Sequence, residues 1–335
     1  MSELNSKQLT DVLNHFKIKG AVENCTRYGN GHINDTYLVI CTQENVEYKY
    51  ILQALNNNVF KESEKVMQNI EKVIKYLKPM VKDKREILNH ILTFDNSTYY
   101  KDSDGRFWRM YDFVADSVCI DLPEPQEFYQ CAVAFGKFQK LLSNFPANEL
   151  YETIPDFHNT PKRYENFVAA IDNNKSGKLP IRVSHNDTKP NNVMLDAKTH
   201  KALCVIDLDT IMPGFSVTDF GDAVRFGAST AAEDEKNLSI VKFDLEKFKA
   251  YTKGFIEGCG AQLPKEEIML LPEGAKMMTL EFGMRFLTDY LDGDTYFKTS
   301  YPEHNLVPCR TQFKLVSEME KYWTEMKNIV KEYCK

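Results

Sequence analysis

The sequence predicts an α+β fold with a small, β-rich N-terminal lobe and a large, mainly helical C-terminal lobe. Runs rich in Tyr, Ile and Val, which favour strands, concentrate in the first third of the chain. Apolar residues at helical spacing dominate the remainder. The chain has 335 residues, more than one core of about 100–200 residues needs, so we expect one two-lobed unit or two domains. We place the lobes at 1–113 and 114–335.

The N-terminal lobe opens with a helix and continues with strands. Leu9, Val12 and Phe16 fall on one face of that helix, and a turn at 102–105 separates the last two strand-like pieces. The expected elements are a helix over 7–16, strand, Gly-rich turn and strand over 26–40, a strand over 46–52, a helix over 62–77, and strand-like pieces over 92–100 and 107–113.

The C-terminal lobe is predicted to consist of helices around one compact strand region. Phe135, Phe138 and Leu142 recur at helical intervals, which is typical of a buried helix face. The expected elements are helices over 128–142 and 163–171, strand, loop and strand over 181–195, a strand over 202–208, and long helices over 242–258, 275–290 and 313–333.

Composition excludes several classes of protein. With 42 Lys+Arg against 48 Asp+Glu the net charge is -6, which argues against a nucleic-acid-binding protein. The longest apolar runs, such as 202–206, fall far short of the roughly 20 residues that span a bilayer. The eight cysteines show neither a CxxC pair nor zinc-ligand spacing, which is typical of a reduced cytoplasmic protein. We expect no secretory signal, no membrane or nucleic-acid partner, and a monomer.

The densest chemical signal is the segment Ser-His-Asn-Asp-Thr-Lys-Pro-Asn-Asn at 184–192, which satisfies H-x-D-x-x-x-x-N. Phosphoryl transfer needs a carboxylate that accepts a hydroxyl proton and hard oxygen ligands for Mg²⁺. We predict that Asp187 is this base. Asn192 and Asp207, which follows Asp187 by 20 residues at the end of an apolar stretch, are the predicted magnesium ligands. Lys189 would place a positive charge beside the transferring phosphoryl group.

This pattern is specific. From the composition it arises by chance about 0.02 times in a chain of this length. The alternative is structural: His185 and Asp187 would cap a turn, while Asn191 and Asn192 would satisfy backbone groups.

The segments HNDTKPNN and VIDLD resemble the catalytic and metal segments of the aminoglycoside phosphotransferase and choline kinase superfamily. Three further segments resemble its N-acetylhexosamine 1-kinase branch: DLDTIMPG at 207–214, DFGDAVR at 219–225, and RFLTDYLDGDTYFKTSYPEHNL at 285–306. The resemblance runs discontinuously from about Gly29 to the C-terminal helix. It implies a bilobal protein-kinase-like fold, with a nucleotide-binding sheet in the N-lobe, a catalytic loop, metal site and sugar pocket in the C-lobe, and ATP and Mg²⁺ as cofactors.

The letters Asp219-Phe-Gly221 spell the metal motif of protein kinases, but they lie 32 residues after Asp187. Asp207 fits the expected distance of about 20 residues. We therefore interpret Asp219 and Asp222 as carboxylates that order the loop. Asp209 stays open between a second metal contact and a turn residue.

On the nucleotide side, the segment Gly-Asn-Gly-His-Ile-Asn at 29–34 partly matches G-x-G-x-x-G. A hairpin turn is the alternative. In its context the segment resembles the phosphate-covering loop of a kinase fold, so Gly29, Asn30 and Gly31 are predicted to bind the nucleotide. The sequence contains no G-x-x-x-x-G-K-[ST], which excludes a P-loop NTPase by this route.

A kinase-like N-lobe also offers a Lys or Arg on its third strand to the phosphates. The matching position here is Gln53, whose amide donates a hydrogen bond but carries no charge. Lys49 on the same face is interpreted as a solvated strand lysine, and Glu62 and Glu64 as solvated too.

The segment 108–113 is interpreted as the hinge between the lobes. The backbone of Arg109 and Tyr111 would then contact adenine. A core strand with alternating apolar residues is compatible with the same pattern.

On the acceptor side, the resemblance implies that His32, Arg285 and Tyr296 contact the sugar together with Asp187. The alternative for Arg285 is a snorkelling surface residue beside an apolar helix face. A further set of carboxylates is interpreted as a solvated face or turn: Glu281, Asp289, Asp292 and Asp294.

The expected reaction is transfer of the ATP γ-phosphoryl group to the anomeric hydroxyl of an N-acetylhexosamine (GlcNAc or GalNAc). One rival keeps the chemistry but takes choline, homoserine or an aminoglycoside. A protein kinase is disfavoured, because the third-strand Lys motif and the A-P-E segment are absent. The last rival is a nucleotide-binding pseudokinase, against which the intact base and metal ligands argue.

Overall fold

The computed structural model describes residues 6–29, 34–57, 59–154 and 179–334. The chain divides into two compact units, Met1–Ala115 and Asp116–Lys335. The predicted helix over 163–171 and the loop residues 30–33 lie outside the described residues. Within the described ranges, every helix is too short or too polar to cross a membrane.

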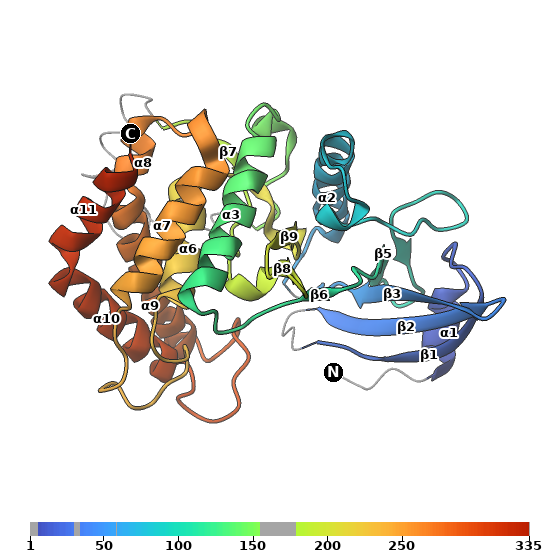
Figure 1. Cartoon of the computed structure of the whole chain (residues 1–335). Coiled ribbons are helices and arrows are strands. Elements are labelled where there is room, and N and C mark those ends of the chain that lie inside the picture. Colours follow the sequence, from blue (N-terminus) through green and yellow to red (C-terminus); the bar gives the residue numbers. More distant parts are fainter. Residues whose placement is uncertain (1–5, 30–33, 58, 155–178, 335) are drawn as a thin grey trace. The chain divides into compact units, whose positions relative to one another are not determined.

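The first unit contains a five-stranded antiparallel sheet in the order β1-β2-β3-β5-β4, whose first three strands run side by side in Figure 1. A tight turn joins β2 to β3, because Glu44 and Asn45 both take positive φ, as a two-residue hairpin loop requires. The elements are α1 (Ser6–Leu13), β1 (Ala21–Arg27), β2 (Asp35–Gln43), β3 (Val46–Ala54), α2 (Ser63–Leu77), β4 (Tyr100–Lys101) and β5 (Phe107–Asp112), with short 3-10 turns at Lys78–Met80 and Lys84–Glu86.

The two faces of this sheet differ in character. One face is apolar and packs under α1, where Phe16 just past the helix meets Leu52 and Trp108. The other face carries polar side chains from three neighbouring strands, because residues directly opposite in an antiparallel sheet point to the same side. Gln53 lies opposite Thr36 of β2 and opposite Arg109 of β5.

The second unit is mainly helical and holds two small antiparallel sheets, β10-β7 and β6-β8-β9. Its strands are β6 (Ser117–Val118), β7 (Arg182–Ser184), β8 (Val193–Asp196), β9 (Ala202–Val205) and β10 (Met212–Gly214). Its helices are α3 (Pro125–Leu141), α6 (Ser216–Gly227), α7 (Leu245–Cys259), α8 (Lys265–Met269), α9 (Leu271–Leu291), α10 (Leu306–Lys321) and α11 (Trp323–Tyr333), with 3-10 turns at Ala147–Glu149, Pro190–Asn192, Leu208–Thr210 and Gly260–Gln262.

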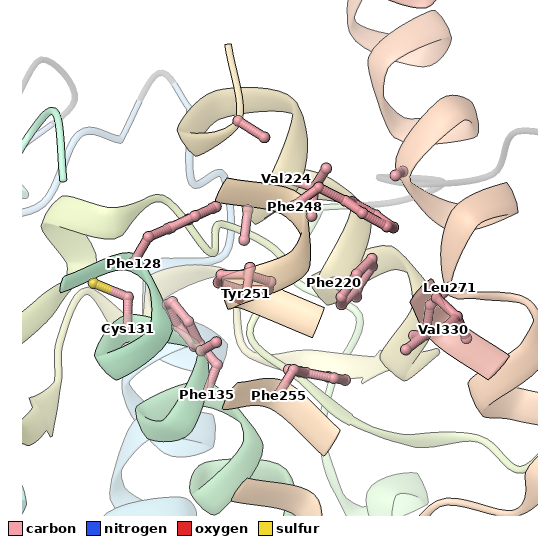
Figure 2. Close-up of a cluster of buried hydrophobic side chains, with 14 of the residues drawn as sticks. Phe128, Cys131, Phe135, Phe220, Val224, Phe248, Tyr251, Phe255, Leu271 and Val330 are labelled. Atoms are coloured by element: carbon pink, nitrogen blue, oxygen red, sulfur yellow. The ribbon is translucent and has the colours of Figure 1, made fainter. Parts of the chain in front are cut away.

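The core of the second unit forms around α3 and α7, which lie side by side in Figure 1. The ring centroids of Phe128 in α3 and Tyr251 in α7 lie 4.4 Å apart, and the ring of Phe220 in α6 lies 5.5 Å from that of Tyr251. Figure 2 shows these side chains in the buried cluster. Glycine lets the helices approach closely. A Cβ on Gly136 would lie 2.5 Å from the carbonyl oxygen of Phe255, so any larger residue would push α3 and α7 apart.

The predicted α+β fold is confirmed, but several of its elements differ from those expected. The helix predicted over 313–333 is two helices, α10 and α11, separated at Tyr322, where neither proline nor glycine marks the break. The strand-like piece over 92–100 contributes only its last residue to β4. Helix α6 over the DFGD segment was not predicted, because nearly every side chain on it is buried and no polar stripe reveals the period.

Candidate active site

The catalytic segment begins where β7 ends. Ser184 pairs with Met212 of β10, and the chain then turns at Asn186, whose φ of 63° is a left-handed conformation that Asn tolerates. The Asn186 side chain fixes this turn, because its Nδ2 donates to the carbonyl of Thr210 at 3.0 Å. The turn exposes Asp187 and Lys189 to partial solvent, while His185 stays buried.

Two carboxylates of α6 hold the backbone of this segment. Asp219 accepts the amide N–H of Asn186 at 2.8 Å and that of His185 at 2.9 Å. Asp222 accepts the N–H of Thr188 at 2.7 Å. Both were interpreted from the sequence as loop-ordering carboxylates, and this is confirmed. Burial raises the pKa of Asp219, and the two N–H donors oppose that rise.

His185 links the segment to the end of β9. One ring nitrogen, Nε2, lies 2.8 Å from the carbonyl oxygen of Ile206, and the other, Nδ1, accepts the N–H of Asp187 at 3.3 Å. Because the carbonyl can only accept, Nε2 carries the proton and the ring is neutral. The rings of Phe135 and Phe138 meet the imidazole edge-on. His185 therefore sets the position of Asp187 and does not itself face the reaction.

Both carboxylate oxygens of Asp187 have a partner. Lys189 Nζ lies 2.9 Å from Oδ1, and Asn192 Nδ2 donates to Oδ2 at 3.0 Å and to the backbone oxygen of Asp187 at 2.8 Å. Burial is the largest influence and raises the pKa of Asp187, but the charge and the hydrogen bond of Lys189, together with weaker effects of neighbouring groups, hold that pKa below its usual range. Burial likewise disfavours the Lys189 charge, yet Asp187 and Asp222 raise the Lys189 pKa. The pair is thus ionised, and Asp187 can accept a proton at neutral pH.

The pH dependence of kcat/KM should reveal the ion pair between Asp187 and Lys189. In Lys189→Met only burial acts strongly on Asp187, so its pKa rises and the carboxylate becomes protonated at a higher pH. We expect the acidic limb of kcat/KM to move to higher pH, and the plateau to fall by roughly 10²-fold through loss of charge stabilisation. The matched control is Lys198→Met, since Lys198 is exposed in a nearby turn. An acidic limb that stays in place would contradict the assigned pairing.

The predicted metal ligands come together at the end of the β8-β9 ladder. Val193 pairs with Val205, and the N–H of Ile206 donates to the carbonyl of Asn192 at 2.9 Å. Asp207 follows immediately, with φ 59° and ψ 58°, so the chain turns there and leaves its carboxylate exposed. Because the NH₂ group of Asn192 faces Asp187, its Oδ1 points the other way.

These donors fit Mg²⁺, which takes carboxylate and amide oxygens and keeps several other oxygen ligands. Among the described residues no three His, Cys, Asp or Glu side chains gather as a metal site, so Asn192 and Asp207 would leave most positions to phosphate oxygens and water. Asp209 is 3% exposed, whereas Asp207 is exposed. Burial favours a role for Asp209 in the turn, and a second metal contact stays unproven.

Arg225 connects the catalytic segment to α9. It is buried, and its Nε donates to Asp222 at 2.8 Å while Nη1 pairs with Glu233 at 2.5 Å. Its guanidinium carbon lies 3.4 Å from the ring centroid of Phe282. Arg285 lies 4.7 Å from the centroid of the same ring. One aromatic side chain therefore contacts both a buried arginine that pairs with the loop-ordering Asp222 and a candidate acceptor residue.

The candidate acceptor residues Arg285 and Tyr296 lie together. Arg285 Nη2 donates to Tyr296 Oη at 3.4 Å, and its guanidinium lies 5.6 Å from the ring of Phe297. Arg285 is half-buried among aromatic rings, which disagrees with the snorkelling alternative. Tyr296 is 46% exposed, so its hydroxyl is accessible to a ligand.

The interpretation of the nearby carboxylates as solvated is wrong for two of them. Glu281 is fully buried and Asp289 is 5% exposed. Asp289 accepts the N–H groups of Tyr296 at 2.7 Å and Phe297 at 2.9 Å, and the Nδ2 of Asn305 at 2.8 Å. The carboxylate therefore fixes the loop that carries Tyr296, a long-range role that helix periodicity does not reveal.

The first unit holds the predicted nucleotide residues. Gly29 has φ 76°, and no atom of the described residues lies within 4 Å of the position where a Cβ would stand. Asn30, Gly31 and His32 lie outside the described residues. Arg109 and Tyr111 lie in β5, which ends at Asp112, shortly before the first unit ends at Ala115. Contact of their backbone with adenine stays a prediction.

The remaining N-lobe residues are placed as follows. Lys49 is exposed and pairs with Glu47 at 2.9 Å, as expected of a solvated lysine. Glu62 is exposed and pairs with Lys65. Glu64 is exposed as well, and it accepts the hydroxyl of Tyr99 at 2.8 Å.

Comparison with known proteins identifies the segment that contains this loop. Residues 141–251 match the model of the APH family, described as the phosphotransferase enzyme family. The matched segment makes up about a third of the chain. It includes Asp187, Lys189, Asn192 and Asp207, and also the loop-ordering helix α6.

Solved structures similar to the whole chain have the same fold. An aminoglycoside phosphotransferase from Alicyclobacillus acidocaldarius superposes with a TM-score of 0.67 at 11% identity, over 99% of this chain and 98% of that one. A spectinomycin phosphotransferase in complex with ADP and spectinomycin gives 0.57 at 14% identity, over 97% and 100%. A choline kinase from Cryptosporidium parvum gives 0.58 at 11%, over 98% and 99%. The chain therefore shares the fold of these three proteins.

One contributor to the candidate site was missed in the sequence. Gln139 of α3 is buried, and its Nε2 donates to Asp219 Oδ2 at 2.7 Å. It lies four residues after Phe135, on the predicted apolar face of that helix. A lone amide on an apolar face signals a buried hydrogen bond, and this could have pointed to a partner carboxylate.

Proposed function

We propose that this chain is an ATP-dependent kinase that phosphorylates a hydroxyl group of a small molecule. The observation that carries the proposal is the ionised Asp187 held between Lys189 Nζ at 2.9 Å and Asn192 Nδ2 at 3.0 Å, one short loop from Asp207. A proton acceptor, a cation and two hard oxygen ligands are the parts that phosphoryl transfer requires.

In the proposed reaction, the acceptor hydroxyl oxygen bonds to the γ-phosphorus as the bond from that phosphorus to the β–γ bridging oxygen breaks. ADP leaves, and the hydroxyl proton passes to the carboxylate of Asp187. Asn192 Oδ1 and Asp207 would hold Mg²⁺, which when bound neutralises phosphate charge. Lys189 offsets the charge that develops on the transferred group. The neutral His185 keeps Asp187 oriented throughout.

For the acceptor we propose an N-acetylhexosamine that is phosphorylated at its anomeric hydroxyl. The sequence resemblance at 207–214, 219–225 and 285–306 supports this reading. So does the pairing of Arg285 with Tyr296, which offers a fixed donor and a phenol to ring hydroxyls. A half-buried arginine disfavours a cationic acceptor such as choline, because like charges repel strongly where water is partly excluded. The anomeric hydroxyl is also the most acidic of a sugar.

The alternative is another hydroxyl acceptor on the same machinery. The solved structures compared above include proteins named for choline and spectinomycin, and residues 141–251 match the family as a whole and no particular branch of it. Choline, homoserine and an aminoglycoside therefore remain the candidates to test beside the sugars.

A coupled ADP-release assay across GlcNAc, GalNAc, choline, ethanolamine, homoserine and aminoglycosides tests both levels of the proposal. We expect ADP release with an N-acetylhexosamine, and a phosphorus NMR signal that couples to the anomeric proton of the product. ADP release only with an acceptor other than an N-acetylhexosamine would support the kinase activity and contradict the proposed sugar substrate. ATP binding without release from any acceptor would favour the pseudokinase.

A further inference from the structure

We propose that Gln53 of β3, held by Arg109 of β5, is the donor that the N-terminal sheet offers to the phosphates of ATP. Two side chains would then together fill the role that a single third-strand lysine has toward the nucleotide phosphates. Gln53 supplies the hydrogen bond and Arg109 supplies the positive charge. This inference rests on the proposed function, since it takes ATP as the ligand.

Strand register places the two residues together. Gln53 lies directly opposite Arg109 of β5 and directly opposite Thr36 of β2, so the three side chains share one face of the sheet. It is the face opposite to the apolar one that packs under α1, to which Leu52 and Trp108 belong. By the sequence resemblance, position 53 is where a kinase-like third strand carries its cation, and the polar row crosses the sheet at that position.

The hydrogen bonds fix which end of the Gln53 amide faces outward. Arg109 Nε and Nη2 donate to Gln53 Oε1 at 3.0 and 2.9 Å. A guanidinium has donors only, so the amide oxygen must face it and the NH₂ group must point away. That NH₂ donates to Thr36 Oγ1 at 3.0 Å. Within the described part of the chain Thr36 is its single acceptor, which leaves one N–H for a phosphate oxygen.

Burial makes the charge of Arg109 effective at a distance. Arg109 is 1% exposed, and its Nη1 packs against Met67 Sδ of α2 at 4.0 Å. Interactions between charges are screened far less in such surroundings than in water. The same charge reaches His90, whose pKa is lowered to about 3 by burial first and by Arg109 second. Gln53 itself is half-buried, so a ligand can reach its amide.

A purely structural role for the pair is the competing explanation, and Gln53→Glu separates the two. A glutamate keeps an acceptor toward Arg109 and gains an ion pair, so the fold and the melting temperature should hold. It also presents a carboxylate oxygen where the NH₂ group stood. We expect calorimetric titration to show ATP·Mg²⁺ binding weakened about tenfold or more, because a hydrogen bond to a charged group is lost. Affinity for adenosine, which has no phosphate, should stay unchanged.

A second pair of variants moves the positive charge from β5 to β3. Arg109→Gln should weaken ATP binding, and adding Gln53→Lys to it should restore most of the affinity by placing the cation on β3. Lys49→Met is the matched control, since Lys49 lies exposed on the same strand.

Unchanged ATP affinity in Gln53→Glu would overturn this inference and leave the proposed function intact. A wild-type chain that binds neither ATP nor adenosine would overturn the proposed function as well.

Discussion

Replacing Asp187 by asparagine should abolish turnover, with kcat reduced by roughly 10²–10⁴-fold or more. The amide has nearly the shape of the carboxylate but cannot accept a proton. It still offers one oxygen to Asn192 Nδ2 or to Lys189, which contact the two oxygens of Asp187 at 3.0 and 2.9 Å. We therefore expect ATP affinity and melting temperature near those of the wild type. ADP release, calorimetric titration with ATP and thermal unfolding measure the three quantities.

Asp121→Asn is the control for Asp187→Asn. Asp121 accepts the Nδ2 of Asn191 at 2.9 Å at an exposed position beside the same loop, so the control removes an equal charge from the same neighbourhood. It should retain nearly full activity, because exposed polar contacts contribute little. Full turnover in Asp187→Asn would exclude this residue as the base. Equal losses in both variants would indicate a general charge effect.

The proximity of the candidate catalytic residues could be predicted because the chain itself brings them together. Asp187 and Asn192 lie within one short loop, and Asp207 returns beside them through the β8-β9 hairpin. Their spacing along the sequence therefore encodes their spacing in space. The two-lobed α+β fold was equally accessible, because strand-forming and helix-forming stretches separate along the chain.

Features that depend on distant contacts could not be predicted. Asp289 was expected to be solvated, but it accepts N–H groups from a loop six to eight residues further on and from Asn305. Arg109 was assigned a backbone role, yet its side chain makes the notable contact, with a residue 56 positions away. A helix that is buried all round, such as α6, has no amphipathic period to detect. Sequence patterns report local periodicity, and these properties are set by tertiary packing.

Asp219→Asn should cost both stability and activity, because three donors converge on this one carboxylate. Oδ2 accepts the N–H of His185 at 2.9 Å and the Nε2 of Gln139 at 2.7 Å, and Oδ1 accepts the N–H of Asn186. An asparagine has one oxygen, so its NH₂ group must face at least one of these donors. Gln139 can rotate its amide to accept, but a backbone N–H stays buried and unpaired. Each such group costs about 1–3 kcal/mol.

The expected result is a free energy of unfolding lower by about 2 kcal/mol or more, with kcat reduced at least tenfold, since displacement of the loop by about 1 Å can slow catalysis 10²-fold. Urea unfolding and ADP release measure the two effects. The control is Asp196→Asn, because Asp196 also accepts a backbone N–H, that of Thr199 at 3.0 Å, but in an exposed turn. There water can satisfy the freed group. Asp219→Asn with the stability and turnover of the control would show that α6 does not order the catalytic loop.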